Sequence, residues 1–170
     1  MPDPLRPLRV NAAELLRQPG ATSRIEARLE ADALGIDHPA LDGDIDVAID
    51  LDVLDDGIIA VGAVSARWAS GCRRCLRDLN EVLVIEVDEL HQIEVTDPDA
   101  FAIENRRLDL APMVRESVLL ELAADRLCRR DCAGLCPECG IDLNDGACGC
   151  DTEVVDDRWA ALDALVVDED

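Results

Sequence analysis

The residues with the clearest capacity for chemistry are eight cysteines, which fall into four close pairs along the chain. Zinc favours four thiolates in a tetrahedron, and two cysteines a few residues apart let one tight turn supply two of them. This spacing predicts metal binding. The pairs are Cys72 with Cys75, Cys128 with Cys132, Cys136 with Cys139, and Cys148 with Cys150.

The last two pairs predict one zinc site. The segment Cys136-Pro-Glu-Cys139-Gly140 has the form of a zinc knuckle, in which both sulfurs face one ion and the glycine gives the chain a flexible exit. Cys148 and Cys150 follow closely, so four ligands lie within fifteen residues. We therefore assign Cys136, Cys139, Cys148 and Cys150 to one ion.

The other four cysteines, Cys72, Cys75, Cys128 and Cys132, are expected to form a second site. A zinc ion with four thiolates carries a net charge of about −2, and nearby guanidinium groups would stabilise it. Two other interpretations stay open: a redox pair at Cys72 and Cys75, or surface thiols without a metal. A redox pair of the thioredoxin type should open a helix after a strand. Six arginines flank these two cysteine pairs: Arg73, Arg74, Arg77, Arg126, Arg129 and Arg130.

The elements that must position these cysteines include three strands. Residues Asp44 to Leu54 alternate aliphatic and acidic side chains, which predicts a strand with one face in the core. A turn at Asp55-Asp56-Gly57 leads into a second strand, Ile58 to Trp68, and a third follows at Glu81 to Ile93. Cys72 and Cys75 then lie in the loop between the second and third strands.

Helices and further strands complete the expected core. The segment Leu108 to Leu127 has helical spacing, with Asp109 as N-cap and an apolar stripe facing the sheet. That stripe consists of Val114, Val118, Leu119 and Leu122. We also expect a helix at Leu8 to Gln18, ended by Pro19-Gly20, a strand at Ser23 to Glu30, a loop containing Gly35, His38-Pro39 and Gly43, a polar loop at Thr96 to Glu104, and a short helix at Asp156 to Leu165.

The predicted fold class is α+β: an antiparallel β-meander or partly closed barrel, a packed helix, and a C-terminal cysteine-rich zinc-binding tail. Residues 1–127 would form the sheet and helix core, and residues 128–170 the tail with its short helix. Between Cys128 and Cys150 the only large hydrophobic residues are Leu135, Ile141 and Leu143. Such a segment cannot offset its ordering entropy by burial alone, so metal must stabilise it.

Composition narrows the classes of function. The 170 residues carry a formal net charge of −22, and none is lysine. Aromatic residues make up 2%, which disfavours base stacking, and the acidity repels phosphate, so the expected partner is basic. No apolar run approaches the ~20 residues that span a bilayer, and the N-terminus has no signal-peptide pattern. We expect a cytoplasmic protein with reduced thiols.

Catalytic motifs are sparse. The only histidines are His38 and His91, and each is expected to be a surface or strand residue rather than a catalytic base. The sequence has no G-x-S-x-G motif and no glycine-rich phosphate loop. We therefore expect a protein that is not an enzyme.

The stretch CRRDCAGLCPECGIDLNDGACGC, Cys128 to Cys150, resembles the C-terminal signature of the YceD family, the large ribosomal RNA subunit accumulation proteins. Cys72-Arg-Arg-Cys75 is similar to that family's C-x2-C between strands, and the likeness extends from about Asp44. It implies a bacterial cytoplasmic factor that supports accumulation of large-subunit ribosomal RNA, with a basic ribosomal protein or a large-subunit precursor as partner. The alternatives are a thiol redox protein using Cys72 and Cys75, and a zinc protein that contacts RNA directly through Arg73, Arg74, Arg129 and Arg130.

Overall fold

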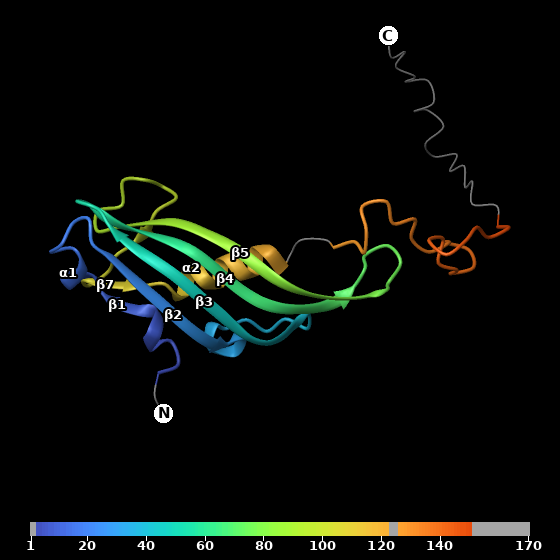
Figure 1. Cartoon of the computed structure of the whole chain (residues 1–170), viewed down its shortest axis with the longest axis horizontal. Coiled ribbons are helices and arrows are strands. Elements are labelled where there is room, and N and C mark those ends of the chain that lie inside the picture. The colour runs from blue at the N-terminus through green and yellow to red at the C-terminus, as the bar shows by residue number, and fades with distance from the viewer. Residues whose placement is uncertain (1–2, 123–125, 151–170) are drawn as a thin grey trace, which may run out of the picture.

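A curved five-stranded sheet dominates the computed structural model, which describes residues 3–122 and 126–150 (Figure 1). The sheet order is β2-β3-β4-β5-β6, and the first four strands form an antiparallel meander. Short β6 adds in parallel at the end of β5. The strands are β2 (Thr22–Glu30), β3 (Leu41–Val53), β4 (Gly57–Gly71), β5 (Asp78–Gln92) and β6 (Phe101–Ala102).

The α+β class and the antiparallel meander are therefore confirmed. Among the described residues, β2 and β6 at the two margins do not pair with each other, so the sheet is open. Hairpin positions also agree with the sequence: Leu54 donates its N–H to Gly57 O at 2.9 Å across the expected turn. The loop between β4 and β5 carries Cys72 and Cys75, as predicted.

Alternation in β3 places the core. Ile45, Val47 and Ile49 are buried on one face, while Asp46 and Asp50 lie on the other. Burying one aliphatic side chain contributes about 1.5–3 kcal/mol, and a register slip by one residue would turn all of them to water. The two-residue period therefore fixes both the register and the buried face.

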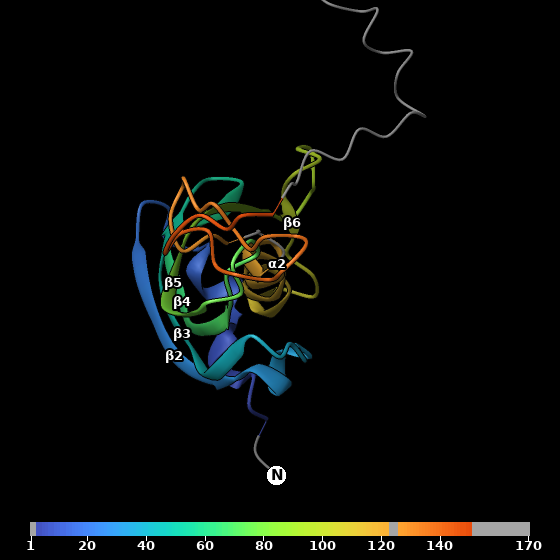
Figure 2. The ribbon, with the colours of Figure 1, turned by 90° about the vertical axis from the view of Figure 1, so that its right-hand side faces the viewer.

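Helix α2 (Ala111–Leu122) covers the buried face of the sheet (Figure 2). Val114 and Val118 are fully buried against it, and Leu122 is nearly so. The helix begins later than predicted, because Leu108 and Asp109 belong to the strand β7 (Arg107–Asp109). Asp109 still accepts the N–H of Ala111 at 3.0 Å.

The predicted helix over Leu8 to Gln18 is wrong for most of its length. The chain forms a 3-10 turn η1 (Arg6–Leu8), strand β1 (Arg9–Asn11) and one helical turn α1 (Ala12–Leu15). Strand β1 pairs antiparallel with β7, so a contact with residues about a hundred positions away overrides the local helical pattern.

Three other local predictions need comment. The loop expected around Gly35 is preceded by a 3-10 helix, η2 (Ala31–Leu34), and Gly43 already lies within β3. The polar loop expected over Thr96 to Glu104 contains β6, whose residues Phe101 and Ala102 pair with the end of β5. The helix expected over Asp156 to Leu165 falls outside the described residues.

Gly62 marks the closest backbone approach in the centre of the sheet. A Cβ at this position would lie 2.2 Å from Ala48 O and 2.8 Å from Ile49 Cα, both in the neighbouring strand. Because these are backbone atoms, the overlap can be relieved only by moving β3 away from β4. Only glycine fits here without displacing a strand.

Gly62→Ala should therefore lower the unfolding free energy by about 1–3 kcal/mol, the usual cost of forcing an extra group into a packed site. Urea denaturation followed by circular dichroism would measure it. Gly146→Ala is the matched control, because a Cβ at Gly146 meets nothing within 4 Å. Equal stability of the two variants would contradict the close approach.

Candidate functional site

All eight cysteines gather into two clusters near the tip of the β4–β5 hairpin. Within each cluster the four sulfur atoms lie within 4.8 Å of one another, so each could hold one metal ion. The two clusters have the same members as the two sites that the spacing indicates. The first cluster is Cys72, Cys75, Cys128 and Cys132, and the second cluster is Cys136, Cys139, Cys148 and Cys150.

The first cluster joins two distant parts of the chain. Its first pair lies in the β4–β5 loop, and its second pair follows α2 in the segment that Figure 1 shows beside that loop. Cys72 Sγ lies 3.8 Å from Cys132 Sγ, and Cys75 Sγ lies 3.6 Å from Cys128 Sγ. Four sulfurs at the zinc–thiolate distance in a tetrahedron would be about 3.8 Å apart. The geometry fits a four-thiolate metal site.

Each cluster is built on a knuckle with the same backbone hydrogen bonds. Cys72 donates its N–H to Arg77 O at 2.8 Å, and Leu76 donates to Cys72 O at 2.9 Å. The knuckle over 136–141 repeats both bonds, each at 2.9 Å. In each, the residue after the second cysteine has a left-handed backbone: φ is 60° at Leu76 and 73° at Gly140. Sequence reasoning found the glycine but missed that Leu76 takes the same conformation.

The knuckle turns also set the acidity of the leading thiols. The backbone N–H of Cys75 points at Cys72 and lowers the pKa of that thiol to about 6. The N–H of Cys139 does the same for Cys136 and lowers its pKa to about 7. Burial raises the pKa of Cys128 to about 12. The first cluster therefore combines thiols of lowered pKa, Cys72 and Cys132, with thiols of raised pKa, and a central divalent cation would favour ionisation of all four.

Three of the flanking arginines have defined contacts with groups other than the sulfurs. Arg74 donates to Cys132 O at 2.9 Å, and Arg77 pairs with Asp142 at 3.0 Å, while the expected offset of thiolate charge stays a prediction. Arg126 stacks over Trp68, with 5.2 Å from its guanidinium carbon to the ring centroid. These contacts join the tail to the hairpin rather than to the sulfurs.

Asn144 is a supporting residue that sequence reasoning missed. Its Nδ2 donates to Cys132 Sγ at 3.4 Å, while its Oδ1 accepts from Ala133 N at 2.9 Å and Arg129 Nη2 at 2.8 Å. A hydrogen bond to a ligand atom orients that atom and tunes its basicity. No motif spacing marks this asparagine, because its partners become neighbours only after the tail folds.

Backbone contacts fix the start of the tail on the hairpin tip. Leu135 donates its N–H to Arg74 O at 3.2 Å, and Arg73 donates its own to Arg126 O at 3.0 Å. A Cβ on Gly134 would lie only 3.2 Å from the same Arg74 oxygen. The first cluster and these bonds thus cross the boundary expected between residues 127 and 128, while the division itself stays a prediction.

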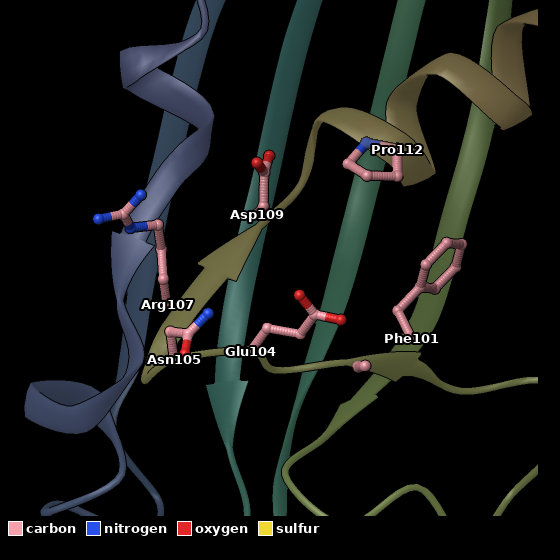
Figure 3. A pocket seen from close by; sticks show the side chains of 7 residues that line it. Phe101, Glu104, Asn105, Arg107, Asp109 and Pro112 are labelled. Carbon is pink, nitrogen blue, oxygen red and sulfur yellow. The ribbon is translucent and has the colours of Figure 1, made fainter.

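A separate pocket of about 520 Å³ lies around β6 and β7 (Figure 3). Phe101, Glu104 and Pro112 line it, together with Asp109, whose carboxylate already pairs with Arg9 at 3.0 Å. It lies away from the cysteine clusters. Its lining contains two carboxylates, those of Glu104 and Asp109, and no serine, cysteine or histidine.

His91 is a strand residue and His38 is half-buried in the loop before β3, in agreement with the positions expected from the sequence. His38 accepts the N–H of Ala40 at 3.2 Å. His91 lies in β5, is fully buried and stacks on Phe101 with 5.3 Å between ring centroids. Neither of its ring nitrogens has a hydrogen-bond partner among the described residues.

The family described as "Large ribosomal RNA subunit accumulation protein YceD" matches residues 60–166, a stretch that contains both clusters. The chain belongs to the YceD family. No solved structure matches it.

Three relatives show how widely this YceD sequence is shared. The uncharacterized protein Rv2926c of Mycobacterium tuberculosis is 31% identical over 169 residues, covering 92% of this chain and 80% of its own length. The protein YlbN of Bacillus subtilis is 29% identical, covering 63% of this chain and 65% of its own. The chloroplastic "Large ribosomal RNA subunit accumulation protein YCED homolog 1" of Arabidopsis thaliana is 32% identical over 65 residues, which is 38% of this chain and 20% of its own.

In the part of the chain that the structure describes, no helix has the length and apolar character needed to span a bilayer.

Buried His91 predicts a specific dependence of stability on pH. Burial lowers the pKa of its imidazole from 6.5 to about 4, so between these values the unfolded chain binds a proton that the folded chain does not. His91 therefore does not lower the free energy of unfolding above pH 6.5. As the pH falls from 6.5 toward 4, the free energy of unfolding decreases with a slope approaching roughly 1.4 kcal/mol per pH unit. His91→Phe should remove this component in urea titrations at pH 7.5 and 5.

The matched control is His38→Asn, which keeps an acceptor for the N–H of Ala40 and should retain the wild-type pH dependence. The interpretation would be wrong if His91→Phe and the wild type lost stability equally over this pH range.

Proposed function

We propose that this YceD protein is a non-enzymatic, zinc-stabilised accessory factor of ribosome biogenesis in the cytoplasm, which supports accumulation of large-subunit ribosomal RNA. Two comparisons support the biological part: the family description, and the plant relative whose printed name refers to accumulation of the same RNA. The site supports the structural role of the metal.

The observation that carries the non-enzymatic part is the completeness of each ligand set. A catalytic zinc site has three protein ligands and one open position, whereas a structural site has four. Each cluster offers four sulfurs within 4.8 Å of one another. Together they would occupy all four coordination positions of a tetrahedral zinc ion and leave none for water or substrate. Zinc has no redox chemistry, so bound thiolates would serve to fold the chain.

Metal binding would supply the stabilisation that the tail lacks. In the described part of the tail, the buried residues are Cys132, Gly134 and Cys136, which have little aliphatic surface. A structural zinc site contributes on the order of 10 kcal/mol, more than this limited burial can provide. The tail would therefore fold on the hairpin when zinc binds.

The partner in this proposal is a basic ribosomal protein or a large-subunit precursor. A net charge of −22 favours encounter with a cationic surface and disfavours exposed RNA phosphates. Complementary charge mainly raises the association rate and suppresses wrong partners. An accessory factor that must find a basic protein among many others would benefit from both effects.

The two alternatives have less support. A redox role for Cys72 and Cys75 would use a pair at the start of a helix, but these cysteines lie between two strands, and Cys75 lies 3.6 Å from the sulfur of Cys128. Direct RNA contact would need free guanidinium groups near the clusters. Instead, Arg74 donates a hydrogen bond to Cys132 O, and Arg129 donates one to Asn144 Oδ1.

Zinc analysis tests the structural part. Protein purified without a chelator should contain two zinc ions per chain by atomic emission. Cys75→Ser should remove only the ion of the first cluster and Cys139→Ser only that of the second, because no ligand is shared. Each variant thus controls for the other. Absence of zinc from the wild-type protein, or alkylation of all eight thiols without a chelator, would rule out this assignment.

A deletion strain tests the biological part. Loss of the gene should lower the ratio of large- to small-subunit ribosomal RNA, and the wild-type gene should restore it. Cys75→Ser should fail to restore it, because the tail would no longer be held on the hairpin tip. Unchanged ribosomal RNA in the deletion strain would refute the proposed function, whatever the metal content.

A further inference from the structure

Among the described residues, two margins of the main sheet lack a partner strand along most of their length: the outer side of β2 and the outer side of β5. Strand β5 pairs with β4 over its whole length, from Gly57 opposite Gln92 to Gly71 opposite Asp78, with no shift in register. On its other side only His91 and Gln92 pair, with short β6. Among the described residues, the rest of β5, residues 78–90, is an open edge.

Hydrogen bonds at both ends of β5 show which residues face this edge. Ile103 donates its N–H to Gln92 O at 2.7 Å, so Gln92 turns its polar backbone away from β4. At the other end, Cys72 donates to Arg77 O at 2.8 Å, so odd-numbered residues turn toward β4. Because direction alternates along a strand, the even-numbered residues present N–H and C=O to the edge: Asn80, Val82, Val84, Glu86, Asp88 and Leu90.

This edge lacks several of the features that block strand addition. Natural edges are short, or carry charged side chains, proline or a bulge. Here the edge spans more than ten residues without proline or a bulge, and its outward side chains include Val82 and Val84, which are 63% and 65% exposed. Its charged side chains are all acidic, so they oppose an added acidic strand but not a basic one. It is suited to pair with another extended chain.

Charge indicates what that chain is. The opposite margin, β2, carries two arginines: Arg28 pairs with Asp46 at 2.6 Å, and Arg24 pairs with Asp50 at 2.8 Å. On β5, no described residue forms an ion pair with Asp78, Glu86, Asp88 or Glu89. Four carboxylates without a described ion pair therefore lie along this edge, and β5 contains no arginine to offset them.

The same charge disfavours two other occupants. A second copy would place one acidic β5 against another, and like charges on neighbouring strands are destabilising. The chain's own residues 151–170 contain eight acidic residues and one arginine, so they too would be repelled. A cationic extended segment avoids both penalties.

We propose that the open edge of β5 binds an extended basic segment of a partner protein as an added β-strand. Backbone groups of Val82, Val84 and Glu86 would pair with that segment, as in other complexes formed by strand addition. Its basic side chains would lie on the exposed face, near Glu86 and Asp88, with their aliphatic stems over Val82 and Val84; its aliphatic side chains would lie on the opposite face. The inference rests on the proposed function for the basic nature of the partner, and adds where and how the partner binds.

The test uses a defined probe, a fluorescent ten-residue peptide that alternates lysine and valine, with the full-length zinc-loaded protein. The peptide should bind, and it should slow amide exchange at Val82, Val84 and Glu86 by at least about tenfold, the signature of new backbone hydrogen bonds. An analogue N-methylated at alternate residues should lose binding, although its charge is the same. A glutamate–valine analogue should not bind.

Two variants locate the site. Val84→Pro removes an N–H that faces the open edge, and it keeps the hydrogen bonds to β4 because those come from odd-numbered residues. This variant should abolish the exchange protection that the peptide gives. If that variant does not fold, Glu86→Lys tests the same edge through charge and should weaken binding about tenfold or more. Glu30→Lys, the same change at an exposed glutamate of β2 that has no described ion pair, is the matched control and should bind as the wild type does.

Several results would overturn the inference. Equal binding by the N-methylated peptide would show attraction by charge alone, and protection at other strands would place the site elsewhere. Edge amides protected without peptide would identify the occupant as a second copy if protection rises with protein concentration, or as residues 151–170 if their removal abolishes it. The deletion strain separates the two claims: normal ribosomal RNA refutes the proposed function, whereas full restoration by Glu86→Lys refutes only the edge.

Discussion

The arrangement of this protein depends on one limitation of its composition: the cysteine-rich tail has too few apolar side chains to fold by burying them. Its order must come from its contacts with the tip of the β4–β5 hairpin, where Cys72 and Cys75 meet Cys128 and Cys132. These thiols belong to segments more than fifty residues apart, so a metal ion at their centre would close a long loop. The hairpin is thus both part of the sheet and the support for the tail.

The need to support the tail explains the length of β4 and β5. Helix α2 covers only part of the sheet, and the two strands continue beyond it until they reach the cysteines (Figure 1). Near the end of the covered region, Arg126 stacks on Trp68 and pairs with Glu121, which links the helix end to the extended hairpin. The extension that presents the first cluster also leaves β5 without a neighbour on one side.

Sequence patterns predicted the features that depend on local repetition. The two-residue period of β3 gave its buried face, and the paired cysteines gave both clusters, because each knuckle is a local turn with a fixed spacing. Features created by distant contacts were missed: β1 pairs with β7, and Asn144 reaches Cys132 only in the folded tail. The arginines were correctly placed near the clusters, but their partners depend on side-chain geometry that spacing does not contain.

The distribution of charge matters more here than its total. At physiological ionic strength, exposed charges act over a Debye length of about 8 Å, so a partner at the surface responds to nearby groups and not to the whole charge of −22. Arg24 and Arg28 of β2 pair with Asp50 and Asp46 of β3, whereas β5 contains no arginine. A zinc ion in each cluster would leave a net charge of about −2 there, and Arg77 near the first cluster pairs with Asp142. Among the described residues, the open edge of β5 therefore combines carboxylates that have no ion pair with backbone groups that have no partner strand.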